Sequence, residues 1–421
     1  METLKKAPTL RQNKKTIDIL ELQLPQEIRI KIFEYFEKKE LMRLATVSKS
    51  WRDFIFGTPR FWRCMNLKLS CRRQSKHNEA ACWYAARLGE HFRDLTISCL
   101  HANKHIHCDT MAVCLRKLLL NLRQANLTTL IITDLRCRSA RTPIWSSIVR
   151  ILTRILSRCG QLQQFGMPLV QWKVPEGSKF LNTVLSKARG TLHSLRIDGF
   201  FKPVTFKKRF LRPVEFDQLT NGILALNHLT QLGIDYFILT DAFVDALSRS
   251  YANLRKLTLF LNGSSCFIKI ISHKSWANLV KGCQQLKVGL RMISGAYGLH
   301  TYALLDLLDP VLHLSDIRIK CTKTFAFYNM RGALNEISHY FSHCLVKLEL
   351  DLNSSGRSDT EFLGLVRQCK HLVHLNVSAN FVDLETARIA MALVEQRRRD
   401  LSVRDLPGSS KKRVRANPPD A

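Results

Sequence analysis

One short pattern recurs through most of the chain and constrains its fold more than any other feature. An apolar residue is followed three and five positions later by two more, as in FRDLTI from residue 92, LHSLRI from 192 and LVHLNV from 372. Ten copies follow one another at gaps of 25 to 37 residues, and the copy near residue 286, LKVGLRM, is the poorest. Alternating apolar residues fit a short strand with one buried face. Self-similarity at this period indicates a solenoid of stacked units.

The residues between the copies carry helical periodicity. Apolar stripes at helical spacing run through 109–125, 146–160 and 240–253, and each segment ends just before the next copy of the pattern. The unit is therefore a helix and then a strand, repeated, and it resembles leucine-rich repeats. The spacing departs from that family in its variable gaps, and only LVHLNVSAN (372–380) comes close to the consensus. The alternative is an accidental pattern in an ordinary α/β protein.

Composition sets the broad class of the protein. The chain has 421 residues, of which 46% are hydrophobic and 24% charged, ordinary values for a globular protein. Lys and Arg outnumber Asp and Glu by 65 to 34, a balance that bears on partners and solubility and not on fold. The 13 cysteines show no regular framework, which favours reduced thiols in an intracellular protein. No apolar run suits a signal peptide or a membrane span, so we expect a soluble protein of the cytoplasm, the nucleus or both.

Residues 21–67 have a different character and predict three short helices. Leu24-Pro25 suits a helix start, because the N–H that proline lacks would be unpaired in the first turn anyway. Apolar residues at helical spacing follow, and Ser48 or Ser50 is placed to cap a third helix that carries Trp51. Three helices in about forty residues are too few to bury this much apolar surface among themselves. Surplus apolar surface on a small helical unit indicates a protein interface.

This segment resembles the F-box motif. The resemblance rests on LPQEIRIKIFEYF, ELMRLATVSKSWRDF and FWRCMNL in that order, with Phe36 and Glu40 where many members have leucine and aspartate. It implies binding to the Skp1 adaptor of a cullin-RING ubiquitin ligase, and apolar and aromatic anchors suit such an interface. The residues that would meet Skp1, or support the helices that do, are Leu24, Pro25, Ile28, Ile32, Phe33, Leu41, Leu44, Val47, Trp51 and Trp62. The alternative is an N-terminal helical domain in which these residues are simply the core.

Two further stretches narrow the resemblance. FWRCMNLKLS with EAACWYAARLGEHFRDLTI, and SWANLVKGCQQLKVGLRMI, are similar to segments of the F-box only proteins 33 and 39. This similarity extends over most of the chain, although only the F-box part is specific, and it implies no particular substrate.

No catalytic or metal-binding constellation stands out. His101, His105, His107 and Cys108 lie close together, but no second cluster at ligand spacing follows, so a loop between repeats is the preferred interpretation. The chain has no phosphate-binding GxxxxGK loop and no GxSxG elbow. We therefore expect no catalytic residues, no metal and no cofactor, in a protein that is not an enzyme.

Basic runs lie at both ends of the chain and at 206–212 (FKKRFLR). Near the C-terminus, a candidate nuclear localisation signal consists of Lys411, Lys412, Arg413 and Arg415. For the rest of the charge, a basic concave surface that attracts an acidic segment of a protein partner ranks first. Merely solvated charge ranks second. Nucleic acid ranks third, because no aromatic platform for stacking bases lies beside these runs.

Together these features predict an α/β protein with a basic N-terminal segment (1–20), a three-helix F-box (21–67), an irregular leucine-rich-repeat solenoid (68–400) and a basic disordered tail (401–421). The expected function is that of a substrate-recognition adaptor in an SCF-type (Skp1–cullin–F-box) ubiquitin ligase, which raises the effective concentration of a protein substrate. The alternative is a basic nucleic-acid-binding repeat protein with an F-box-like helical cap. Salt separates the two, because binding driven by phosphate contacts falls steeply as salt rises.

Overall fold

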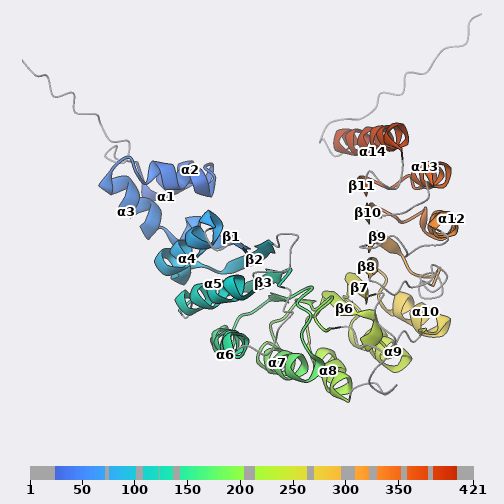
Figure 1. The fold of residues 1–421 in the computed structure, drawn as a ribbon, viewed down its shortest axis with the longest axis horizontal. Helices are drawn as coiled ribbons and strands as arrows, with labels where there is room; N and C mark the ends of the chain where they lie inside the picture. Colours follow the sequence, from blue (N-terminus) through green and yellow to red (C-terminus); the bar gives the residue numbers. More distant parts are fainter. Residues whose placement is uncertain are drawn as a thin grey trace, which may run out of the picture.

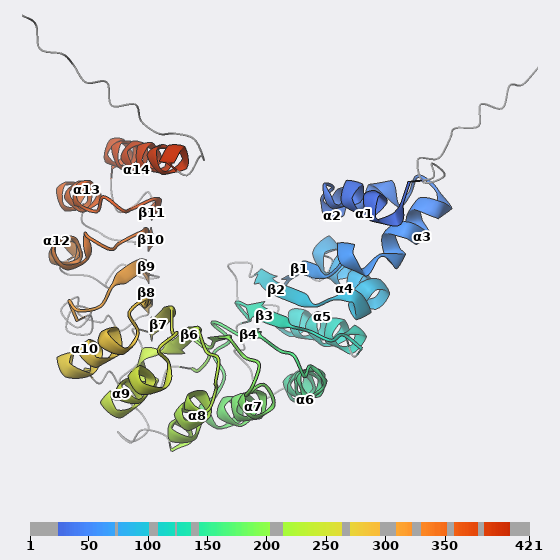
Figure 2. The ribbon, with the colours of Figure 1, turned by 180° about the vertical axis from the view of Figure 1, so that it is seen from behind.

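The computed structural model of the protein describes residues 24–71, 75–100, 108–122, 124–135, 143–202, 214–262, 270–294, 309–321, 330–351, 358–377 and 383–404. These residues form an N-terminal helical unit and a long curved array of strands and helices (Figure 1). The strands line the inside of the arch and the helices its outside, as the opposite view also shows (Figure 2).

The strands of the described residues form one parallel sheet, in which each strand pairs with the next one in the sequence. Their bounds are β1 Cys64–Ser70, β2 Asp94–Leu100, β3 Thr129–Thr133, β4 Gln164–Gly166, β5 Ser194–Arg196, β6 Gln231–Asp235, β7 Lys256–Asn262, β8 Lys287–Ser294, β9 Leu314–Cys321, β10 Lys347–Asp351 and β11 His374–Val377. This order means that each unit packs mainly on its two neighbours, as in a solenoid.

The helices of the array pack on the outer face of the sheet. They are α4 Lys76–Leu88, α5 Cys108–Asn121, α6 Pro143–Arg158, α7 Val174–Lys187, α8 Glu215–Leu224, α9 Asp241–Ser250, α10 His273–Gly282, α12 Met330–Phe341, α13 Asp359–Gln368 and α14 Leu384–Arg404, with short 3-10 turns η2 Gly89–His91 and η3 Tyr236–Ile238. Within the described ranges, no helix combines the length and the apolar character that crossing a bilayer requires.

The strands begin where the repeating pattern predicts them. Except in the copies at 286 and 314, each strand starts two residues after the first apolar residue of its copy. The next two apolar residues of the copy point between sheet and helices, so that Leu130 and Ile132 on β3 are fully buried. The two exceptions are neighbours, and a register irregularity between Val288 and Gly289 absorbs the difference in spacing. The predicted succession of helix and strand is therefore confirmed.

The first strand, β1, was not among the predicted copies. Met65, Leu67 and Leu69 alternate with exposed residues and are buried. These residues belong to a further copy of the pattern, which begins with Trp62, three residues before Met65 and five before Leu67. This copy was not recognised in the sequence because its first apolar residue is a tryptophan, and Trp62 had been assigned to the end of the N-terminal unit.

The C-terminal boundary also differs from the prediction. Helix α14 runs to Arg404, so it continues past residue 400, where the disordered tail was expected to begin. Residues 401–404 contain neither glycine nor proline, and the first helix breaker after them is Pro407. The candidate localisation residues (Lys411, Lys412, Arg413 and Arg415) lie outside the described residues, as do residues 1–20 and the histidines at 101, 105 and 107.

Candidate protein-interaction surface

The N-terminal unit consists of α1 Gln26–Glu34, α2 Lys38–Leu44, α3 Lys49–Gly57 and the 3-10 turn η1 Pro59–Phe61. Pro25 stands directly before α1, and its carbonyl accepts a hydrogen bond from the N–H of Ile28 at 3.0 Å. Of the two serines that could cap the third helix, the structure uses Ser48, whose hydroxyl accepts from the N–H of Trp51 at 3.1 Å. The three predicted helices are therefore present.

Aromatic rings form the small core of this unit. Phe33 is buried, and its ring lies 5.1 Å from that of Trp51, 5.2 Å from that of Phe54 and 6.2 Å from that of Phe61, measured between ring centroids. Edge-to-face arrangements predominate, as is favourable for such pairs. This packing fixes α1 against α3 and so determines which side chains α1 leaves outside.

Trp62 joins the N-terminal unit to the array. Its side chain is fully buried, and its Nε1–H donates to the carbonyl of Ile55 on α3 at 2.8 Å. Its ring also lies 6.1 Å from Phe56 of α3 and 6.1 Å from Tyr84 of α4. One side chain therefore contacts both regions, and the two are packed together through it.

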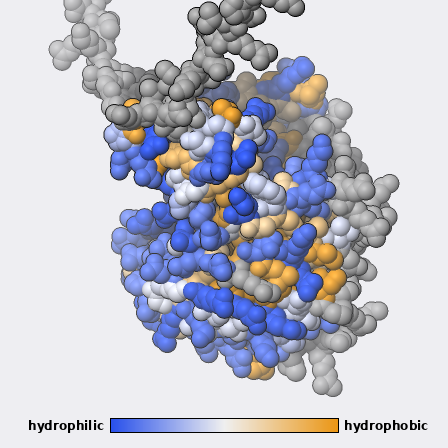
Figure 3. Space-filling view, turned by 90° about the vertical axis from the view of Figure 1, so that its left-hand side faces the viewer, coloured by the Kyte–Doolittle hydropathy of each residue, from blue (hydrophilic) through white to orange (hydrophobic). Residues whose placement is uncertain are grey.

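An apolar patch remains exposed on the N-terminal unit. We define the exposed apolar patch by Ile28 (41% exposed), Ile32 (40%), Tyr35 (90%), Phe36 (39%) and Val47 (63%). Ile28, Ile32 and Tyr35 are spaced four and three residues apart, so they share one face of the first helix and its end. Figure 3 looks onto the side of the molecule that carries these helices, and hydrophobic patches interrupt its otherwise hydrophilic surface.

The structure separates the ten residues predicted for Skp1 binding into three groups. Pro25, Ile28, Ile32 and Val47 are exposed; Leu24, Leu44 and Trp51 are half-buried; Phe33, Leu41 and Trp62 are buried. The buried residues hold the helices in place and offer no surface to a partner. Tyr35 and Phe36, which were not among the ten, are also exposed and follow directly on the apolar stripe of α1.

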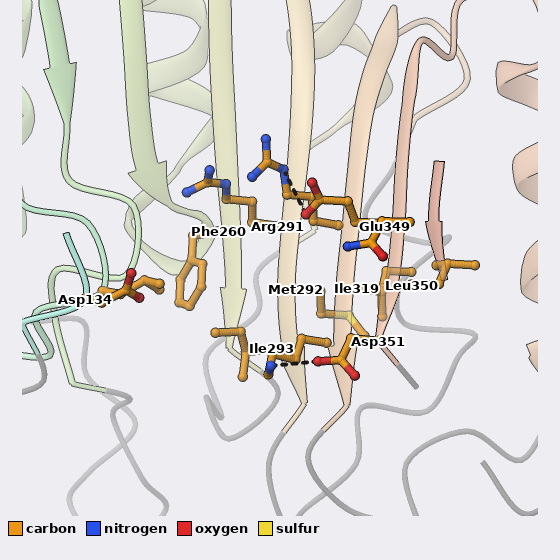
Figure 4. A pocket seen from close by; sticks show the side chains of 13 residues that line it. Asp134, Phe260, Arg291, Met292, Ile293, Ile319, Glu349, Leu350 and Asp351 are labelled. Carbon is orange, nitrogen blue, oxygen red and sulfur yellow. Dashed lines mark hydrogen bonds and ion pairs between the residues drawn. The ribbon is translucent and has the colours of Figure 1, made fainter. Parts of the chain in front are cut away.

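A second candidate surface is a hollow of about 500 Å³ on the inner side of the arch. Figure 4 shows Asp134 and Phe260 on one side of this hollow and Glu349 and Asp351 on the other. The remaining lining residues are Leu169, Arg291, Met292, Ile293, Arg318, Ile319, Lys320, Leu350 and Asn376.

The charges of this hollow are largely compensated by one another. Arg318 donates from Nε and Nη2 to the two carboxylate oxygens of Asp316, both at 3.1 Å, and Lys320 pairs with Asp351 at 2.6 Å. Arg291 donates to Oδ2 of the buried Asp198 at 2.8 Å. Around this hollow, therefore, the basic side chains of β8 and β9 are paired with carboxylates.

A buried carboxylate supports the turn beside these pairs. Asp235 is fully buried and accepts hydrogen bonds from the backbone N–H groups of Gly199 and Phe201, the latter at 3.2 Å. Gly199 has a φ of +74°, a conformation that glycine adopts without strain. Burial raises the pKa of Asp235 well above 3.8, its ordinary value, and the nearby charge of Asp198 raises it further. Its contacts are with backbone, so its role is structural.

The described residues offer little chemistry for a metal or a nucleophile. Among them, no three His, Cys, Asp or Glu side chains gather in a group that could hold a metal ion. Burial raises the pKa of the Cys283 thiol, and it raises that of Cys369 to about 12. Both thiols therefore stay protonated at neutral pH and behave as small apolar side chains.

Comparison with known proteins adds one family. The family model described as F-box-like matches residues 22–68, which cover the whole N-terminal unit and most of β1. Among solved structures, the chain is similar to the N-terminal His-tagged D-allulose 3-epimerase from Methylomonas sp. in complex with D-allulose, at 11% identity and a TM-score of 0.20, over 70% of this chain and 92% of that one. The form of that epimerase with additional C-terminal residues matches at 9% identity, with the same coverage and TM-score. Such low TM-scores carry no argument about fold or function, whereas the family match coincides with the unit that the geometry delimits. The chain therefore carries an F-box-like domain at residues 22–68.

Proposed function

We propose that this protein is the substrate-recognition adaptor of an SCF-type ubiquitin ligase. Its F-box-like domain binds Skp1, and its strand–helix array, which resembles leucine-rich repeats, binds a protein substrate. The observation that carries the proposal is the exposed apolar patch on an F-box-like domain whose own core is already complete. Apolar and aromatic side chains left outside a finished core are typical of an interface.

The chemistry of the patch suits a protein partner more than a charged ligand. Ile28 and Ile32 present aliphatic side chains, while Tyr35 adds a large ring with a polar end. Aromatic residues are frequent among the few side chains that dominate binding energy. Covering the remaining exposed surface of each isoleucine contributes on the order of 1 kcal/mol. Binding should therefore persist in moderate salt.

The array supplies the second half of the proposed function. Each strand pairs with the next one in the sequence, and Trp62 packs the F-box-like domain directly onto the first unit. A continuous, packed connection keeps the distance between the two binding surfaces constant, so a bound substrate stays at high effective concentration near the ligase. In this proposal the ubiquitin-transfer chemistry belongs to other subunits, and the chain is a receptor and not an enzyme. The similarity to F-box only proteins 33 and 39 fits this role.

Co-purification with Skp1 tests the proposal. The full chain is compared with a variant that carries Ile32→Asp and Val47→Asp, and with a control that carries Leu384→Asp and Met391→Asp on α14. All four side chains are exposed, from 40% to 67%, so none of the changes empties the core. We expect a stoichiometric complex with the full chain and the control, and loss of the complex in the first variant.

A folded full chain that forms no complex with Skp1 would contradict the proposal, as would equal loss in the control. Circular dichroism and a thermal melt of each variant establish that it is folded. In either case the runner-up, a nucleic-acid-binding repeat protein, becomes the leading hypothesis. Titration with single-stranded DNA across a salt series then tests it, because phosphate contacts weaken steeply as salt rises.

A further inference from the structure

A row of residues lies along the edge of the sheet where each strand begins, directly before the strand or, for Lys287 on β8, at its first position. In this strand-start row, the backbone N–H of each residue donates to the carbonyl of the residue before it in the row, at 2.8 or 2.9 Å. Its members are Arg63, Arg93, Thr128, Gln163, His193, Thr230, Arg255 and Lys287. The ladder fixes these residues side by side, one strand spacing apart, along one edge of the arch.

The middle of this edge carries positive charge and no carboxylate of its own. The segments that lead into β4 to β8 (159–163, 188–193, 225–230, 251–256 and 283–287) contain no Asp or Glu. Within them Arg255, Lys256 and Lys287, hereafter the basic cluster, are all exposed. None of these three is in an ion pair with another described residue. Farther along β8 and β9, by contrast, Arg291, Arg318 and Lys320 have carboxylate partners.

The register of the sheet brings like charges together in this cluster. Lys256 on β7 pairs directly with Lys287 on β8, and the N–H of Lys287 donates to the carbonyl of Arg255. Like charges at facing positions of neighbouring strands are destabilising. Asp316 lies close by on β9, but Arg318 holds both of its oxygens. A site that keeps three positive charges together without a counter-charge is matched to an anionic partner.

Polar rings and hydroxyls extend the cluster on both sides. The rings of His193 and His228 stack with centroids 5.7 Å apart, and both side chains are exposed before β5 and β6. His313 is exposed before β9, where its carbonyl accepts from the N–H of Val288. In their neutral form, His228 and His313 can each donate one hydrogen bond to a carboxylate oxygen, whereas Nδ1 of His193 already donates to the carbonyl of Thr191 at 2.7 Å.

We propose that the strand-start edge from β5 to β9 binds an extended acidic segment of a protein, with the basic cluster at the centre of the site. Neighbouring strands are about 4.8 Å apart, so the four spacings from β5 to β9 span about 19 Å, which an extended segment of about six residues covers. Carboxylates of such a segment face the basic cluster, and its backbone and flanking side chains meet the histidines and Thr230.

The side chains of the edge favour a protein segment over a nucleic acid. Single-stranded nucleic acids bind where aromatic platforms alternate with basic residues. Between residues 188 and 193, 225 and 230, 252 and 256, and 283 and 287, the edge segments contain no Phe, Trp or Tyr. Tyr251, at the start of one segment, is buried and donates its hydroxyl to the carbonyl of Ile223. The rings available are therefore imidazoles, which suit carboxylates.

This inference deepens the proposed function, because it names the chemistry of the substrate segment, but its test needs no Skp1. Fluorescence anisotropy measures binding of labelled hexaglutamate to the full chain, with hexaglutamine as the uncharged comparison. The test variant combines Arg255→Gln, Lys256→Gln and Lys287→Gln. The matched control removes three exposed charges from the outer helices, through Arg150→Gln, Arg154→Gln and Lys187→Gln.

We expect the full chain and the control to bind hexaglutamate more tightly than hexaglutamine, and the test variant to bind it about tenfold more weakly than the control does. Both variants lose the same net charge, so a difference between them locates the site. Equal weakening in both would overturn the inference, as would hexaglutamate binding no tighter than hexaglutamine. Tighter, cluster-dependent binding of single-stranded oligo-dT would overturn it in favour of a nucleic acid. Retained Skp1 binding in any of these cases leaves the proposed function intact.

Discussion

The F-box-like domain and the strand–helix array differ in how completely they bury their apolar residues. In the array, the paired apolar residues of successive strands are fully buried, as Leu195 on β5 and Leu259 on β7 illustrate. In the F-box-like domain, by contrast, Ile32 is 40% exposed and Val47 63% exposed. The array thus buries these apolar residues against its own neighbouring units, whereas the domain at its end leaves some of its apolar residues exposed.

This difference in burial shows where each region obtains its stability and which surface it leaves for binding. A repeat in the middle of the array has a neighbour on each side, so most of its apolar residues serve packing and its exposed surface is largely polar. The F-box-like domain packs on one neighbour only, through Trp62, and keeps apolar surface for a partner. Apolar recognition at the terminus and charged recognition along the strand-start edge follow from this arrangement.

The largest effect is expected where the two regions meet. Trp62→Ala removes a fully buried ring and the hydrogen bond from Nε1 to the carbonyl of Ile55. Substitutions of this kind cost about 3–5 kcal/mol. Urea denaturation should show destabilisation of this size, and limited proteolysis should cleave first near the junction. Unchanged stability would mean that the two regions do not depend on each other, and the comparison would lose its structural basis.

A smaller effect on stability is expected from Asp235, a carboxyl group that is buried in the array. Burial raises the pKa of Asp235, so between its ordinary value of 3.8 and the raised value the folded protein binds a proton that the unfolded chain has released. The free energy of unfolding therefore falls as pH rises through this window. Asp235→Asn removes the titration, so the stability of the variant relative to wild type should rise with pH, by up to about 1.4 kcal/mol per unit.

Urea denaturation at a series of pH values from about pH 4 upward measures this slope. The lost carboxylate oxygen changes one backbone hydrogen bond, from Gly199 or Phe201, and so shifts the difference at every pH without creating a slope. A difference between variant and wild type that stays constant with pH would show that Asp235 does not titrate in this window.

Much of the array could be predicted from the sequence because its signal is local and repeated. The strand after Leu254 begins two residues later, as the pattern requires, and the helix predicted over 240–253 is α9, which Thr240 caps through its hydroxyl. By contrast, the ion pair between Arg291 and Asp198 joins residues 93 positions apart. Such pairs depend on the curvature of the arch, which the repeat pattern does not encode, so the sequence did not predict which basic residues have carboxylate partners.

The sequence predicted which segment forms the candidate interface, but not which of its side chains are exposed. Phe33 and Ile32 are adjacent apolar residues on one helix, and the F-box resemblance implied that each meets Skp1 or supports the helices that do. One is buried and the other exposed. Only the packing of Phe33 against Trp51 and Phe54 decides between them. The like-charge pair at Lys256 and Lys287 was missed for a similar reason, because strand register brings together residues from different repeats.

The like-charge pair of Lys256 and Lys287 provides a third test, with a smaller expected effect on stability. Lys287→Gln removes the repulsion from Lys256 and should raise the free energy of unfolding by about 0.2–1 kcal/mol at low salt. The gain should shrink as salt is added, because exposed charges are screened. Lys281→Gln on α10 is the control, since this exposed lysine has no strand partner of like charge and should show no gain. Destabilisation by Lys287→Gln would imply an anionic partner within the chain itself.

The smallest effect on stability is expected in the exposed apolar patch, where the effect on Skp1 binding should be largest. Val47→Ser exchanges an exposed apolar side chain at the turn between α2 and α3, so the free energy of unfolding should change by no more than about 0.5 kcal/mol. The equivalent exchange in the array, Leu259→Ser, empties a fully buried position and should be severely destabilising. Thermal melts of both variants measure the contrast, and Skp1 pull-down of the Val47 variant measures its cost in binding. If Val47→Ser destabilised the chain as Leu259→Ser does, Val47 would belong to the core of the F-box-like domain, and its exposed surface would no longer argue for a partner.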